Sequence, residues 1–598
     1  MKPHRLILAL LILASMSTAR ALPEFDAWIE EFAREWMQAE PMTATRAQYL
    51  APAEQDANDR LLSGAEGFFP VDASARAART ERARRGLTEL KRWSPAELTP
   101  VQRVSSDLLT WRFENTIRAS EAAGSLYVFE QFYGLHLTLV GFLTETHPIR
   151  NRRDVENYLA RLEQVAPLLD RGVAEARARA ARGIVPPRFI LNATLGGLER
   201  FLAPAPAENV LVTTLVERVA KLKDFPAGER AAALAAAEKI VAESARPAFV
   251  RVRDLLAEQA KTATDEPGLW KLPKGDEIYA AQLATYTTTT LTPDEIHAIG
   301  LREVARIEGE MDKILRTLGY AEGSVKDRYL KLNATLIPPA TPDPRAAIMA
   351  EYARIVREAE VRAPAFFDLL PKAPVEVRRE PAYREAAAAA HYSPPAPDGS
   401  KPGIFWAPLA SLEPDVLWLG AGMKTVAYHE AVPGHHYQIT LQQELPEVPR
   451  FRKLRALGGL PAFSEGWGLY SERLADEAGW YEGDPTGRLG YLQAQLFRAR
   501  RLVVDTGLHA KHWTRQQAID YGVQPSEVDR YVVVPGQACS YMIGQLRILE
   551  LREKARTALG AKFALKEYHN LLLRTGEVPL DVLTQVVDEW IAAQRARG

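Results

Sequence analysis

Apolar residues recur at helical spacing along most of this chain. In segment 25–37, FDAWIEEFAREWM, they fall at positions i, i+3, i+4 and i+7, so one face of a helix is apolar. Segment 154–169 repeats this period, and further segments are rich in alanine, the best helix former. Thr292, Pro293 and Glu295 supply an N-cap, a first-turn proline and a capping box, which together predict a helix start. The pattern therefore predicts a mainly α fold.

Two short segments interrupt the helical pattern and are typical of β-strands. Residues 375–380, VEVRRE, alternate in polarity, and residues 404–409, IFWAPL, are aromatic and bounded by turn formers. Between them, segment 393–403 is rich in Pro and Gly and is predicted to be a loop. A small β-sheet is therefore expected just before a cluster of histidines that begins at residue 429.

The length of 598 residues predicts either several domains or one large, two-lobed domain. Segment 264–275, TDEPGLWKLPKG, contains prolines and glycines at which regular structure is expected to stop. We therefore expect an N-terminal helical lobe, residues 22–270, and a second lobe, residues 271–598, that holds the sheet and the histidine cluster.

Residues 1–21 are typical of an export signal. A basic start precedes the apolar run 6–13, and residues 19–21 fit an A-x-A cleavage signal. The apolar run is too short to span a bilayer as a stable helix, although an N-terminal helical anchor is the alternative. No cysteine lies near the cleavage position to carry a lipid. We expect a mature chain that starts near Leu22, is not stably inserted in a membrane, and is periplasmic or secreted.

Charge and cysteine content exclude several classes of protein. The 75 Lys and Arg residues balance 76 Asp and Glu residues to a net charge of −1, so no strong field for nucleic acid is present. The single cysteine, Cys539, cannot form an intramolecular disulfide, and we expect it to be buried and inert. The sequence has no phosphate-binding loop of the Walker or dinucleotide type.

Three of the eleven histidines lie within eight residues, in the segment YHEAVPGHHYQ. Zinc peptidases often carry H-E-x-x-H on a helix, where two histidines four residues apart face one metal. Here His435 and His436 follow His429 by six and seven residues. On a regular helix one of them would point about 120° away, and the other would lie about 10.5 Å along the axis. Neither would share one ion with His429.

Pro433 and Gly434 account for this spacing. Pro433 removes the N–H that would bond the carbonyl of His429, and Gly434 tolerates unusual backbone angles. Together they predict a kink that absorbs the two extra residues and lets His435 meet His429 at one metal. His435 is our preferred second ligand, and His436 is the alternative.

A third ligand is needed if one position is to stay open for water. Glu465, in the segment PAFSEGWGLYSERLADEAG, is the best candidate, and Glu472 or Asp476 would orient a histidine ring. A histidine pair is ordinarily exposed or structural, and acidic helix positions are ordinarily solvated. The compound pattern nevertheless favours a metal site, and we expect one Zn²⁺ per chain. Spacing alone does not distinguish zinc from manganese or cobalt.

The segments HEAVPGHH and FSEGWGLYSE resemble those of a bacterial family known as domain of unknown function 885. Segments 391–403, 501–513 and 535–544 match it as well, and with weaker upstream matches the resemblance covers most of the mature chain. This family is similar to the gluzincin metallopeptidases, largely helical enzymes with two histidines and a glutamate on zinc. The resemblance implies a large, two-lobed metallopeptidase-like fold and a hydrolase that acts on peptides. Lys401 stands where the family carries arginine, and a lysine lacks the planar fork of that side chain.

The same resemblance and the chemistry of the residues give an expected mechanism. Glu430 would take a proton from a zinc-bound water as this attacks an amide carbonyl, and would pass it to the leaving nitrogen. The developing oxyanion needs a donor from the protein. Tyr541 is the first candidate and His509 the second.

Further residues are expected beside the metal or the substrate. Arg501 and Asp505 are spaced i, i+4 and are expected to form a structural pair, although Arg501 is also a candidate reader of a substrate carboxylate. Residues 404–409 would offer an edge strand to an extended peptide. The residues expected to lie beside the metal ligands or to contact the substrate are His436, Glu472, Arg501, Asp505, Gln537 and Lys401.

Two other functions fit the same residues. One is a metal-dependent hydrolase of a non-peptide amide, and the other is a non-catalytic periplasmic protein that binds zinc or peptide. The presence of Glu430 argues against the second, because a pure binding site needs no base there. The substrate is thus expected to be a peptide or small amide. The peptide end attacked and the oligomeric state do not follow from the sequence.

Overall fold

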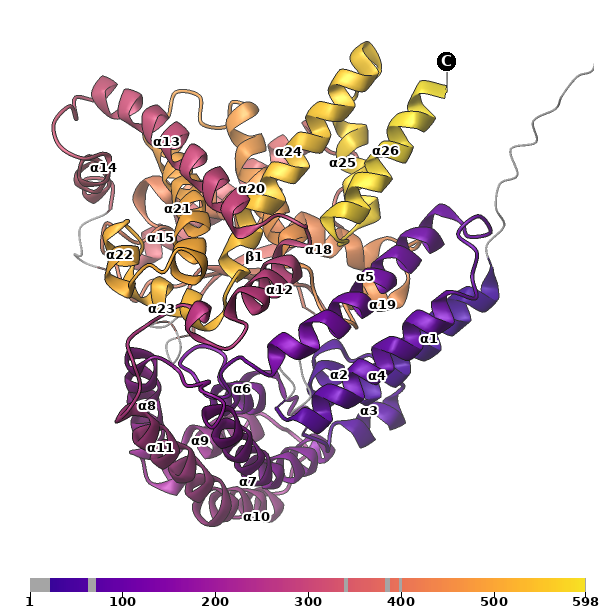
Figure 1. Cartoon of the computed structure of the whole chain (residues 1–598), viewed down its shortest axis with the longest axis vertical. Helices are drawn as coiled ribbons and strands as arrows, with labels where there is room; N and C mark the ends of the chain where they lie inside the picture. Colours follow the sequence, from indigo (N-terminus) through magenta and orange to yellow (C-terminus); the bar gives the residue numbers. More distant parts are fainter. Residues whose placement is uncertain are drawn as a thin grey trace, which may run out of the picture.

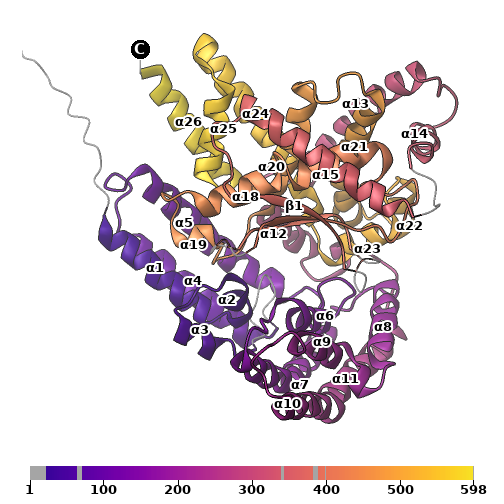
Figure 2. The same ribbon diagram turned by 180° about the vertical axis from the view of Figure 1, so that it is seen from behind.

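The computed structural model describes residues 22–62, 71–337, 343–381, 385, 388–396, 399 and 401–596. The predicted export signal, residues 1–21, lies outside this part. The described chain is mainly helical with one small sheet, as predicted. Helices α1–α11 gather in one half of the molecule, and the later elements form the other half (Figures 1 and 2). None of the helices in the described ranges is long and apolar enough to cross a membrane.

The helices of the first half follow the apolar periodicity. Phe25, Ile29 and Phe32 are buried along one face of the first helix, as the i, i+4, i+7 spacing predicts. The bounds are α1 Pro23–Gln38, α2 Pro41–Ala47, α3 Pro52–Asn58, α4 Ala73–Leu90, α5 Pro100–Ala123, α6 Leu135–Gly141, α7 Arg152–Ala180, α8 Arg188–Leu202, α9 Val210–Val219, α10 Ala227–Ile240 and α11 Arg246–Ala260.

The second half carries a longer set of helices around the small sheet. The predicted start after Thr292 is confirmed, with both hydrogen bonds of the capping box present. The bounds are α12 Gly275–Thr287, α13 Pro293–Thr317, α14 Val325–Ala334, α15 Arg345–Arg362, α17 Met423–Glu430, α18 His435–Glu444, α19 Arg450–Lys453, α20 Pro461–Glu477, α21 Pro485–Ala510, α22 Arg515–Asp520, α23 Pro525–Val533, α24 Ser540–Leu559, α25 Leu565–Thr575 and α26 Leu580–Ala596.

Four apolar cores hold the described helices together, and one of them joins Ile190 of α8 to residues of α12, α21 and α23. Of the others, one lies within the first half and ends at Ala263, and a second is built mostly from residues after Leu269. A third joins α1, α4 and α5 to Phe451, Leu457 and Leu460 of the second half. The change of core falls in the predicted boundary segment, while the third core ties the halves to each other. The lobe limits of 22–270 and 271–598 stay a prediction.

The sheet has three strands in the order β1–β3–β2: β1 Val375–Arg379, β2 His391–Ser393 and β3 Gly403–Ala407. The central strand β3 pairs in parallel with β1 and antiparallel with β2. Both predicted strands are therefore present, but the expectation that segment 404–409 offers an edge is wrong. The short strand β2, which ends at the first residue of the predicted loop 393–403, covers that side of β3.

Candidate metal centre

The histidine cluster lies at a break between two helices. Helix α17 ends at Glu430 and α18 begins at His435, with a four-residue connection that contains a cis Val432–Pro433 peptide bond. Gly434 packs so closely that a Cβ atom there would lie 1.9 Å from the carbonyl oxygen of His429. Only glycine fits this position, which explains the Pro-Gly pair in the middle of a helical segment.

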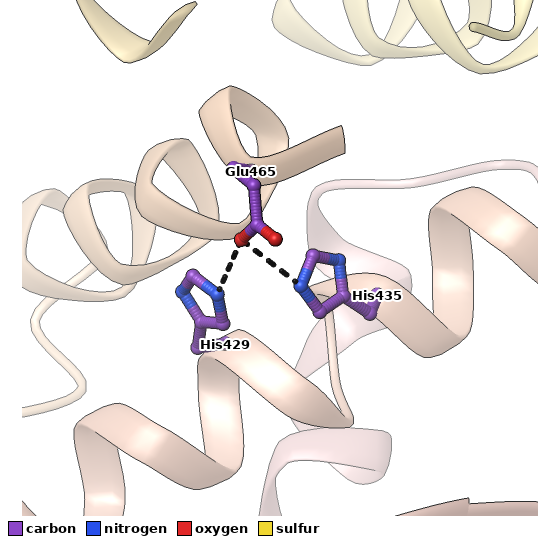
Figure 3. Close-up of side chains that lie close together, drawn as sticks. All are labelled: His429, His435 and Glu465. Carbon is purple, nitrogen blue, oxygen red and sulfur yellow. Dashed lines mark ion pairs between the residues drawn. The ribbon is translucent and has the colours of Figure 1, made fainter. Parts of the chain in front are cut away.

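The break brings three predicted ligands together (Figure 3). Oε2 of Glu465 lies 3.4 Å from Nε2 of His429 and 3.5 Å from Nε2 of His435. Atoms bound to one tetrahedral ion at about 2.0–2.1 Å are about 3.3–3.4 Å apart, so this spacing fits a zinc ion. The three residues supply two nitrogens and one oxygen, and a fourth position is left for water or substrate. In the described ranges this is the one group of His, Cys, Asp and Glu side chains with such spacing.

Helix α20 holds the break in place. The indole of Trp467 and the hydroxyl of Ser471 both donate to the carbonyl oxygen of Pro433, at 3.0 and 3.2 Å. Gly468 lies against the ring of His429, where a Cβ atom would come within 2.6 Å of a ring carbon. The motif around Glu465 therefore does more than provide one ligand, because it also fixes the backbone that positions the histidines.

Glu472 orients the first histidine. Its Oε1 lies 2.8 Å from Nδ1 of His429, and its Oε2 accepts from the amide of Gln495 at 2.9 Å. This contact directs the Nδ1 proton to the carboxylate and leaves Nε2 free to bind a metal. Asp476, the alternative orienting residue, instead accepts from Arg488.

His436, the neighbour of His435 on α18, contacts other partners. Its Nδ1 is 2.9 Å from the hydroxyl of Tyr392 on β2 and 3.2 Å from that of Thr440. Burial lowers the pKa of His436 to about 4. The structure thus brings His435, and not His436, to Glu465.

Replacing Glu472 by glutamine is expected to weaken metal binding about 10- to 100-fold, the usual cost of losing the carboxylate behind a ligating histidine. Competition with a chromophoric chelator measures this affinity. Asp476→Asn on the same helix is the matched control and is expected to bind metal as the wild type does. Equal affinities in all three proteins would contradict an orienting role for Glu472.

The electrostatics of the cluster suit a cation. Although burial opposes a charge on His429, Glu465 and Glu472 outweigh it and raise the pKa of this histidine to about 10. Burial likewise works against a charge on Glu465, but hydrogen bonds from His429 and His435 hold its pKa well below the usual range. A carboxylate that faces two imidazoles in this way is equally suited to hold a divalent metal ion.

Glu430 lies beside the cluster without being part of it. Its side chain is buried, and its carboxyl has no hydrogen-bond partner among the described residues. Burial raises the pKa of Glu430, while the neighbouring His429 and His435 oppose this rise. A carboxyl that no neighbouring group engages, next to three converging donor atoms, is available for a chemical role.

Tyr541, at the start of α24, faces the same region. Burial raises its pKa, and the charge of Glu465 contributes to the rise. The guanidinium of Arg501 lies between two rings, 4.6 Å from the centre of Tyr541 and 4.3 Å from that of Phe497. The guanidinium of Arg501 thus packs against one face of the tyrosine ring. The tyrosine hydroxyl has no hydrogen-bond partner in the part of the chain that the structure describes.

The expected pair of Arg501 and Asp505 is not formed. Arg501 pairs with Glu527 at 2.9 Å and not with Asp505, because the carboxylate on α23 reaches its guanidinium more directly. Asp505 instead accepts from the hydroxyl of Tyr279 and the backbone N–H of Gly536, and burial raises its pKa to about 7.

His509 is not placed to act on a substrate. Its Nδ1 accepts from the backbone N–H of Leu269, and its Nε2 lies 3.0 Å from the carbonyl of Tyr531. Both nitrogens are used inside the core, so the structure leaves Tyr541 as the candidate donor. Of the remaining predicted residues, Gln537 accepts from Arg530 at 2.7 Å, and Lys401 is exposed.

Some contributors were not found from the sequence. Trp467 and Ser471 support the helix break, Gln495 supports Glu472, and Tyr392 supports His436. The first two lie within the segment that supplied Glu465, at positions facing α17, so their spacing was the available signal. Gln495 comes from a distant segment, and no local pattern marks it. Tyr392 lies in segment 391–403, whose match to the family was the available signal.

Solved structures that are similar to this chain over nearly its whole length include two bacterial proteins. A protein from Colwellia psychrerythraea, provisionally described as a lipoprotein, is 29% identical with a TM-score of 0.83, covering 95% of this chain and 99% of its own. A second from Shewanella oneidensis, provisionally described as a lipoprotein of unknown function, is 19% identical with a TM-score of 0.72, covering 95% and 100%. No curated protein matches the sequence.

The model of one protein family matches residues 68–587. This range includes the two candidate histidine ligands, Glu465 and the elements that support them. The chain therefore belongs to the family described as bacterial protein of unknown function, DUF885.

Proposed function

We propose that this protein is an exported zinc-dependent metallopeptidase that hydrolyses peptide amide bonds. The observation that carries the proposal is the convergence of His429, His435 and Glu465 at donor spacings of 3.4 and 3.5 Å, with Glu430 alongside. Two histidines and one carboxylate with an open fourth position are the ligand set of catalytic zinc sites.

Glu430 favours catalysis over simple binding. The cluster of ligands is complete without it, and a storage or transport site would gain nothing from a buried carboxyl with no partner. Its pKa, raised by burial, suits a group that takes up and releases a proton.

The residues divide the chemistry between them. When bound, zinc would polarise the substrate carbonyl and lower the pKa of water. Glu430 accepts a proton from the attacking water and delivers it to the leaving nitrogen. The hydroxyl of Tyr541 donates a hydrogen bond to the oxyanion that develops on the carbonyl. Arg501 keeps the tyrosine ring in place by stacking beneath it.

The sheet supports a peptide as substrate. Strand β2 is an edge of the sheet, and Tyr392 on this strand contacts His436 on the metal-binding helix α18. An extended peptide paired with this edge would run beside the metal ligands.

Export is supported by the N-terminal sequence and by the relatives. Both solved relatives are provisionally described as lipoproteins. Here Cys539 is the single cysteine and is fully buried, so it cannot serve as a lipid attachment site. We propose cleavage near Leu22 and a periplasmic or secreted mature protein.

The first test is the metal content of the purified mature protein. One zinc per chain is expected in the wild type and in Glu258→Ala, an exposed control, whereas Glu465→Ala is expected to lose the metal because it removes the shared ligand. Mass spectrometry of metals gives the ratio, and a peptide library then tests cleavage. A wild type that takes up no metal on reconstitution would contradict the proposal.

A further inference from the structure

Two large aromatic side chains are exposed side by side on the N-terminal half. Phe132 and Tyr133, in the connection between α5 and α6, are 40% and 56% exposed. Their rings meet edge to face with centres 4.5 Å apart. Fixed, adjacent and exposed aromatic rings are a feature of binding surfaces, because exposing them costs solvation free energy unless a ligand covers them.

The connection that carries these rings is rigid. The carboxylate of Glu130 accepts from the backbone N–H groups of both Phe132 and Tyr133 at 2.5 Å. Glu130 is only 4% exposed, and its burial raises its pKa to about 7. Gly134 closes the turn, since a Cβ atom there would lie 2.4 Å from the carbonyl oxygen of Glu130. A buried carboxyl is thus used to hold two apolar rings in solvent.

The same connection docks on the half that carries the metal ligands. The amide of Gln131 donates to the carbonyl of Asp529 at 3.0 Å, and the guanidinium of Arg530 lies 5.5 Å from the centre of the Phe132 ring. Arg530 also donates to Gln537, in the turn that leads into Tyr541. Contacts through Arg530 and Gln537 therefore connect the aromatic pair to the turn before Tyr541, the candidate oxyanion donor.

A second set of contacts leads to the same tyrosine. Arg530 pairs with Glu527 at 3.2 Å, and Glu527 also pairs with Arg501 at 2.9 Å. The guanidinium of Arg501 in turn lies 4.6 Å from the centre of the Tyr541 ring.

We propose that Phe132 and Tyr133 form a specificity subsite that binds an aromatic or large apolar side chain of the peptide substrate. This inference rests on the proposed function and names the substrate class. The donors of Arg530 are engaged by Glu527 and Gln537, so the subsite offers rings and not a free cation. A third ring can pack against an edge-to-face pair and cover its exposed area on binding.

Turnover of matched peptides tests this subsite. Quenched fluorescent peptides would carry Phe, Leu, Ala or Asp at one variable position, scanned along both sides of the cleaved bond. Phe132→Ala/Tyr133→Ala is expected to lower kcat/KM about tenfold for the Phe peptide at one position, and less than about twofold for the Ala peptide. The control is Val361→Ala, an equally simple truncation at a residue that is 83% exposed on α15. Equal losses for both peptides, or no loss, would overturn the subsite.

A binding measurement separates this inference from the proposed function. Zinc-loaded Glu430→Gln with and without the double substitution is titrated with the Phe and Ala peptides by calorimetry. Weaker binding of the Phe peptide alone supports the subsite even if the wild type cleaves nothing. Cleavage by the wild type with no change of peptide preference refutes the subsite and leaves the peptidase intact. Thermal melts check that the variants are folded, as their exposed positions predict.

Discussion

Glu430→Gln is expected to lower kcat/KM for peptide cleavage by about 10³-fold, within the range for a positioned general base. The change keeps the shape of the side chain and removes its ability to accept a proton. Metal content is expected to stay at the wild-type ratio, because Glu430 is not among the three converging ligands. Thermal stability should stay equal or rise, since burial raises the pKa of Glu430 and a neutral amide avoids the cost of a buried charge.

Steady-state kinetics, metal analysis and a thermal melt of the same preparation give these three readouts. Glu472→Gln is the informative comparison, because it neutralises another buried carboxylate of the site but is expected to act through metal affinity. Excess zinc should restore Glu472→Gln and not Glu430→Gln. Full activity in Glu430→Gln, or loss of its metal, would remove Glu430 from the role of base.

The sequence was informative where local spacing decides the structure. The apolar face of α1 and the capping box of α13 depend on residues within a few positions of each other, and both are present. The helix break at the histidines also follows from local chemistry, since Pro433 and Gly434 can be interpreted without knowing their neighbours.

The sequence was less informative where the partner of a residue comes from a distant segment. Arg501 and Asp505 have the spacing of a helical pair, yet each has a better partner on another element, Glu527 for one and Tyr279 for the other. Strand β2 is only three residues long, too short for its own sequence pattern to predict a strand. Its extended structure depends on pairing with β3. Such tertiary partners override a local preference worth only about 0.5 kcal/mol.

The aromatic pair of the N-terminal half belongs to this second class. Nothing in the sequence links Phe132 and Tyr133 to Tyr541, because the two segments are more than 400 residues apart. The link between them runs through Gln537, which was expected beside the metal or the substrate, and through Arg530, which no sequence pattern marks.

Gly434→Ala is expected to destabilise the protein by at least about 2 kcal/mol, the upper part of the range for overpacking, and to remove the bound metal. The new Cβ atom would lie 1.9 Å from the carbonyl oxygen of His429 and 2.4 Å from that of Tyr428. Both are backbone atoms of α17, so relief requires moving the helix that carries the first ligand. A thermal melt and metal analysis measure the two effects.

Gly468→Ala separates the position of the ligand from the integrity of the fold. Here the three atoms nearest to the added Cβ all belong to the ring of His429, at 2.6 to 2.9 Å, and a side chain can rotate away where a backbone cannot. We expect a folded protein with weakened metal binding. Gly309→Ala on α13, where a Cβ has open space, is the matched control and is expected to be as stable as the wild type or slightly more so. Undiminished metal binding in both Gly434→Ala and Gly468→Ala would mean that the close packing around His429 does not set the geometry of the ligands.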